Sequence, residues 1–152
     1  MSTKSIFLFL SLIFAVPAAV TQGFDSAAIS DRAIEAYASG RYSSASQLFE
    51  QEDSVTPLSD GALYLLANSY LNTNRPEMAL ATIQRIASPE TIQLDYLSVK
   101  GQAYIVLGMM NEAADCLESS LLKFEHTDET YFNLEGLLCF CLNELGRHQE
   151  CA

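Results

Sequence analysis

Four residues that favour a left-handed backbone recur along the chain at nearly equal intervals. Gly40, Asn74, Gly108 and Gly146 are separated by 34, 34 and 38 residues. Glycine and asparagine tolerate the conformation that ends a helix, so each position predicts a sharp corner between two helices. A period of this length is typical of stacked helix pairs.

Small residues recur at fixed distances from these corners. One column lies seven residues before each corner, and the other lies five residues after it. The first column holds Ala33, Ala67, Gly101 and Cys139, and the second holds Ala45, Ala79, Ala113 and Cys151. Two helices approach closely only where both carry small side chains, so we expect the two columns to pack together inside each hairpin.

The apolar pattern and the helix-ending residues together predict eight helices and no strand. We expect the helices at residues 26–39, 42–53, 59–73, 75–87, 90–107, 110–124, 128–145 and from 148 onward. The fourth pair is stretched by four residues, and its second helix has barely begun at His148. The sequence therefore predicts an all-α chain of three full hairpins and an incomplete fourth.

Several stretches resemble the motif of the tetratricopeptide repeat family. They are residues 63–70 and 99–104, together with 40–45 and 108–113. The resemblance covers residues 26–152 and implies a right-handed α-solenoid of stacked antiparallel hairpins. It also implies a non-catalytic scaffold or adaptor that holds a peptide or protein in a concave groove lined by the first helices. Carried over by position, the groove residues are Tyr37, Tyr64, Asn68, Leu71, Asn72, Gln102 and Ile105.

A looser resemblance points to another setting. Residues 61–70, following residues 40–49, are similar to the N-terminal repeats of anaphase-promoting complex scaffold subunits. That likeness implies an intracellular scaffold, in the cytoplasm or nucleus, that assembles through its repeats. The first 23 residues favour export instead, because Lys4 precedes an apolar run of 11 residues and then small residues. A cleaved signal peptide would place the protein in the periplasm, in the secretory lumen or outside the cell.

The same leader has other interpretations. It is compatible with an uncleaved N-terminal anchor, although the run is short for a membrane-spanning helix and Pro17 interrupts it. It is also compatible with an ordinary apolar first helix. The formal net charge of −11 argues against nucleic acid and anionic membranes as partners and suits a basic or neutral protein.

No catalytic or metal-binding motif stands out in the sequence. His126 and His148 are the only histidines, and no phosphate-binding glycine loop or nucleophile motif occurs. We therefore expect no enzyme activity, no metal and no cofactor. Cys139 and Cys151 occupy the two small-residue columns of the fourth hairpin, so they could form a disulfide or simply replace alanine in the core. The uncapped C-terminal end of the array is an expected surface for homo- or hetero-oligomerisation.

Overall fold

The computed structural model describes residues 31–88, 96–122 and 129–151. Every regular element in these ranges is a helix, so the prediction of an all-α chain is confirmed for them. The predicted leader, residues 1–23, lies outside the described residues. So do the starts of the helices expected from residues 26, 90 and 128.

Seven α-helices and one short 3₁₀ helix follow one another along the described parts of the chain. They are α2 (Asp31–Ala38), α3 (Tyr42–Asp53), α4 (Asp60–Asn72), α5 (Pro76–Ile83), α6 (Tyr96–Val106), α7 (Met110–Leu121), α8 (Glu129–Glu144) and η3 (His148–Cys151). Most bounds fall within a few residues of those expected. Helix α5 ends a turn early, because the amides of Arg85 and Ile86 donate to carbonyls three residues before them.

Each of the four corners uses the same backbone conformation. Gly40, Asn74, Gly108 and Gly146 have φ angles of 72°, 58°, 75° and 74°. At each corner the amide of the corner residue donates to the carbonyl three residues earlier, and the next amide donates to the carbonyl five residues earlier. These two bonds form the Schellman motif, which satisfies carbonyl groups that the end of a helix leaves open.

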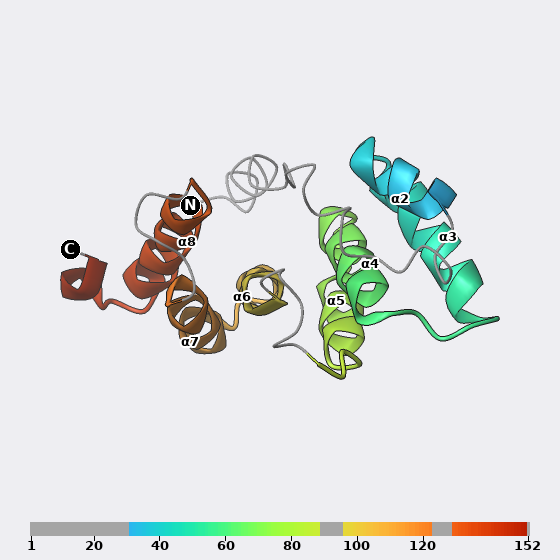
Figure 1. The fold of residues 1–152 in the computed structure, drawn as a ribbon. Helices are drawn as coiled ribbons and strands as arrows, with labels where there is room; N and C mark the ends of the chain where they lie inside the picture. Colours follow the sequence, from blue (N-terminus) through green and yellow to red (C-terminus); the bar gives the residue numbers. More distant parts are fainter. Residues whose placement is uncertain (1–30, 89–95, 123–128, 152) are drawn as a thin grey trace.

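The helices pack in chain order. Figure 1 shows them arranged across the molecule from α2 and α3 at one end to α8 at the other. Helices α2 and α3, α4 and α5, and α6 and α7 form hairpins, and each hairpin contacts the next. The first helices of neighbouring hairpins also contact one another, namely α2 with α4, α4 with α6, and α6 with α8. The packing is therefore repeat-like over the described residues.

The small residues of the first three hairpins are buried between the paired helices. The side chains with no exposed surface include Ala33, Ala45, Ala67, Ala79 and Ala113. Gly101 occupies the equivalent position on α6. A Cβ atom there would lie 2.9 Å from Cγ of Leu117 and 3.5 Å from the carbonyl oxygen of Ala113. Helix α6 thus approaches α7 more closely than an alanine at this position would allow.

A polar network joins the first two hairpins. Arg75, which follows the second corner, donates through Nη2 to Ser46 Oγ at 2.7 Å. Its Nη1 lies 3.6 Å from Glu50 Oε1, and its guanidinium lies 4.6 Å from the ring centre of Tyr70. The Tyr70 hydroxyl donates to the same Glu50 oxygen at 2.8 Å. This network ties the second hairpin to Ser46 and Glu50 of α3.

A related ion pair recurs at the other end of the array. Arg147 follows the fourth corner, and its Nη2 lies 4.0 Å from Glu118 Oε1 on α7. Glu50 and Glu118 each lie ten residues after a corner, and Arg75 and Arg147 each lie one residue after the next corner. The third hairpin carries Met109 at the arginine position. The contact between a corner arginine and the preceding second helix is thus a repeated feature of the packing.

Candidate functional site

The seven residues predicted to line a partner groove all lie on the first helices α2, α4 and α6. Five of them are buried, with 7% or less of their surface exposed: Tyr37, Asn68, Leu71, Gln102 and Ile105. Tyr64 and Asn72 are half-buried. A partner that docks on these helices would therefore meet Tyr64 and Asn72 most directly.

Two carboxamides lie one turn apart along α4. The Asn68 Nδ2 group donates to the carbonyl of Tyr64 at 3.2 Å, and the Asn72 Nδ2 group donates to the carbonyl of Asn68 at 2.9 Å. These bonds restrain both side chains against their own helix. A partner that binds them therefore loses less of its binding energy to ordering flexible side chains.

Two buried polar atoms on the first helices have no hydrogen-bond partner within the described part of the chain. They are the Tyr37 hydroxyl and the Oε1 atom of Gln102, whose Nε2 group donates to Ser98 Oγ at 3.1 Å. Most buried polar atoms in proteins are paired, and an unpaired one costs about 1–3 kcal/mol. Gln102 Oε1 can only accept a hydrogen bond, whereas the Tyr37 hydroxyl can donate or accept one.

The environment of Tyr37 keeps its hydroxyl protonated. Burial is the largest effect, and together with the neighbouring Tyr64 and Tyr42 it raises the pKa of Tyr37 far above its usual value. The Tyr37 ring meets the Tyr42 ring edge-on, with ring centres 5.4 Å apart and planes at 73°. The hydroxyl therefore keeps its proton at physiological pH and can donate a hydrogen bond.

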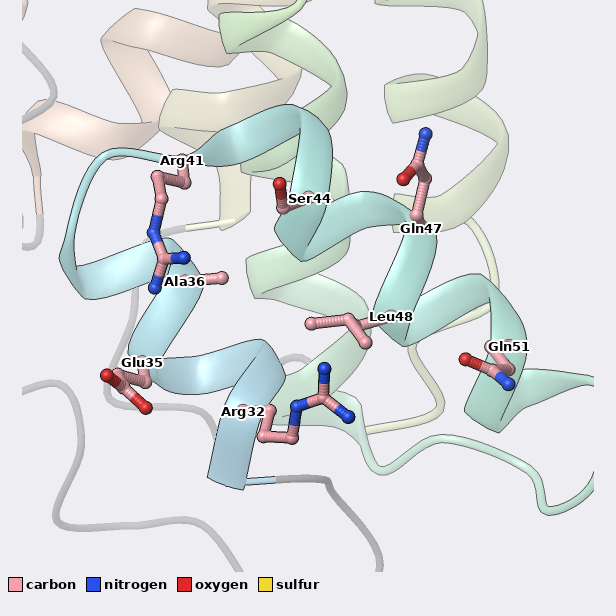
Figure 2. Close-up of a pocket in the computed structure, with 8 residues that line it drawn as sticks. All are labelled: Arg32, Glu35, Ala36, Arg41, Ser44, Gln47, Leu48 and Gln51. Atoms are coloured by element: carbon pink, nitrogen blue, oxygen red, sulfur yellow. The ribbon is translucent and has the colours of Figure 1, made fainter.

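A pocket of about 480 Å³ lies between α2 and α3 (Figure 2). Its lining residues are Arg32, Glu35, Ala36, Arg41, Ser44, Gln47, Leu48 and Gln51. Ala36 is buried and Leu48 is half-buried, while the six polar residues are exposed. The pocket thus has an apolar floor and a polar rim that contains two guanidinium groups.

Sequence reasoning did not find this pocket. A signal was nevertheless present, because Arg41 follows Gly40 as Arg75 follows Asn74. Aligning the repeats on their corners would have shown that arginine recurs at this position. Arg32 carried no such signal, since only the folded hairpin brings it to the same pocket as Arg41.

The described residues offer no metal site: no group of three or more histidine, cysteine or acidic residues is suitably placed in them. Helix α8 carries Cys139 and Cys141, and burial raises the pKa of the Cys141 thiol to about 11. The Cys151 side chain lies outside the described residues, so the disulfide with Cys139 stays a prediction. None of the described helices combines the length and apolar character needed to cross a membrane.

We compared the chain with protein-family models, with curated proteins and with solved structures, and none of the three comparisons found a match. The resemblance to tetratricopeptide repeats therefore stays a prediction from the sequence.

Proposed function

We propose that the chain is a non-catalytic scaffold or adaptor of the tetratricopeptide kind. Its hairpins stack into a solenoid, and the first helices form the inner surface that holds a peptide or a protein segment. The arrangement is a scaffold for recognition because it repeats one packing unit and leaves an extended surface along the array.

The observation that carries this proposal is the contact pattern of the first helices. Helices α2, α4, α6 and α8 contact one another from hairpin to hairpin more extensively than α3, α5 and α7 do. Helices on the inner side of a curved stack lie closer together than those on the outer side. The pattern therefore supports a concave surface formed by the first helices.

The chemistry of this surface suits a polypeptide ligand. Tyr64 supplies rigid aromatic area, and Asn72 supplies a restrained carboxamide. The unpaired Gln102 oxygen would accept a bond from a backbone amide, and the unpaired Tyr37 hydroxyl would donate to a backbone carbonyl. Backbone groups are common to all peptides, so shape and apolar contacts would decide which peptide binds.

Site-specific photo-crosslinking tests the proposal. A photoreactive amino acid at Asn72 or Ser98 places the probe on the first helices α4 and α6. The same probe at Met78 or Ser119 places it on exposed positions of the second helices α5 and α7. In an extract of the source cells, we expect the first two positions to crosslink a common partner and the last two to leave it unlabelled.

The controls separate docking from misfolding. Each variant should retain the helical circular dichroism of the wild type. The variant Asn72→Ala, combined with the probe at Ser98, should reduce the yield of the crosslink because it removes a proposed contact of the same partner on the neighbouring first helix. Equal labelling from α5 and α7, or labelling that Asn72→Ala leaves unchanged, would show that the first helices are not the docking surface.

A further inference from the structure

The arginines of this acidic chain fall into two groups. Arg75, Arg85 and Arg147 each form an ion pair with a carboxylate. Arg32 and Arg41 are exposed, and neither forms an ion pair within the part of the chain that the structure describes. Both unpaired arginines line the pocket between α2 and α3.

The repeats indicate what Arg41 is placed to meet. Arg41 follows the first corner as Arg75 follows the second and Arg147 follows the fourth. The last two reach Glu50 on α3 and Glu118 on α7, each on the second helix of the preceding hairpin. Arg41 is therefore placed to receive a carboxylate from a helix that packs on the face of the first hairpin directed away from the second hairpin.

The pocket extends this contact into a docking surface. In Figure 2 Arg41 lies at one end of the pocket and Arg32 at the other, with the side chains of Ala36 and Leu48 between them. The Glu35 carboxylate points away from Leu48, toward the edge of the pocket. Apolar area at the centre and a positive charge at each end are the features of a surface that binds an amphipathic segment with acidic residues.

We propose that this pocket binds an acidic helical segment of a partner protein, with Arg32 and Arg41 each pairing with a carboxylate. The pocket uses Arg32, Glu35 and Ala36 of α2, but it contains none of the residues assigned to the groove, so it does not depend on the function proposed above. Residues 1–30 contain a single acidic residue, Asp25, so the preceding part of the chain cannot supply both carboxylates. The net charge of −11 would repel such a segment from the rest of the surface, which makes this pocket selective for it.

The spacing of the two arginines sets the spacing of the acids. Arg32 lies in the first turn of α2, and Arg41 lies just beyond its last residue, Ala38. From Arg32 to Ala38 the helix rises by about 9 Å over six residues, and the corner then brings the chain to Arg41. A partner helix that runs alongside α2 would therefore carry its two acids about two turns, or six to seven residues, apart.

A peptide titration tests this. The probe is a fluorescein-labelled, alanine-rich helical peptide with two glutamates about two turns apart. Fluorescence anisotropy at low ionic strength should detect its binding to the wild-type chain, and salt should weaken it. Two exposed ion pairs at about 0.7 kcal/mol each correspond to about a tenfold weaker Kd for the variant Arg32→Gln plus Arg41→Gln.

Two controls match the charge of the test variant and of the probe. The variant Arg85→Gln plus Lys100→Gln removes the same charge outside the pocket and should bind the peptide as the wild type does. A peptide with glutamine in place of both glutamates should bind the wild type about tenfold more weakly, because it loses the same two ion pairs. Equal weakening in the two double variants, or no binding of the glutamate peptide to the wild type, would overturn the proposal. Self-association of the wild type that Arg32→Gln plus Arg41→Gln abolishes would assign the pocket to a second copy and would also overturn it.

Discussion

The close approach of α6 to α7 gives a sharp test of the hairpin packing. A Cβ atom on Gly101 would lie 2.9 Å from Leu117 Cγ and 3.1 Å from its Cδ2. Leu117 has no exposed surface, and Cγ is the branch point of its side chain, so it cannot swing away. Gly136 on α8 is the matched control, because nothing lies within 4 Å of a Cβ atom placed there.

Two opposing effects set the size of the change. Replacing glycine by alanine inside a helix stabilises it by about 0.5–1 kcal/mol. Forcing an extra methyl group into a packed core costs about 1–3 kcal/mol. We expect Gly136→Ala to show the first effect alone and to stabilise the chain by about 0.5–1 kcal/mol. We expect Gly101→Ala to show both effects and to destabilise it by about 0.5–2 kcal/mol.

Urea unfolding followed by circular dichroism measures both free energies of unfolding. The difference between the free energies of unfolding of the two variants isolates the steric overlap of the added methyl group with Leu117, because the helix preference for alanine over glycine is common to both. A double-mutant cycle with Leu117→Ala assigns the overlap to one contact: in that background Gly101→Ala should no longer destabilise, a coupling of about 1–3 kcal/mol. If Gly101→Ala stabilises the chain as much as Gly136→Ala does, the close approach of α6 and α7 is refuted.

Three further outcomes are expected. Because the φ angle of Asn74 is 58°, Asn74→Ala should lower the free energy of unfolding by about 1–2 kcal/mol in urea melts, and Asn74→Gly should leave it nearly unchanged. The hydrogen bonds from Arg85 lower the pKa of Asp53 below its usual value of 3.8. The ionised carboxylate therefore stabilises the folded chain, and Asp53→Asn should lower the free energy of unfolding by under about 1 kcal/mol at neutral pH. This difference should disappear as the pH falls through the lowered pKa of Asp53. A pH series of urea melts measures it, and a difference that does not shrink as the pH falls into the acid range would contradict it. Finally, the Cys141 thiol, whose pKa burial raises to about 11, should resist alkylation at pH 8 in the native chain and react in urea, as mass spectrometry of its peptide would show.

The backbone of the repeats was predictable because few residues tolerate it. A positive φ angle excludes most side chains, so Gly40, Asn74, Gly108 and Gly146 identified the corners without any knowledge of the packing. Residues at a fixed distance from a helix end lie on a fixed face of the helix, which is why corner spacing predicted where small residues would recur. Helix ends were less predictable, as the early end of α5 shows, because the last turn depends on competing hydrogen bonds.

The surface sites were less predictable because long side chains have many rotamers and the fold selects among them. Arg75 and Arg41 follow equivalent corners, yet one crosses to Glu50 and the other borders an open pocket. No local pattern distinguishes them, since the difference lies in whether an acidic helix packs beside them. The burial of Asn68 and Gln102 was hidden for the same reason: position on the first helix placed them on one face, and only the neighbouring hairpins decided how deeply they lie.

The same contact can therefore stabilise the array at one place and bind a partner at another. Arg75 belongs to the second hairpin, and the first hairpin supplies its partner Glu50. This ion pair is therefore internal and forms as the chain folds. At Arg41 the equivalent contact is not made within the described residues, so any helix that supplies the carboxylate gains the interaction. An exposed pair contributes little by itself, which is why the apolar side chain of Leu48, the half-buried part of the pocket floor, has to provide the remaining affinity. A variant such as Leu48→Ser should consequently weaken binding of the acidic peptide even though it leaves both arginines in place.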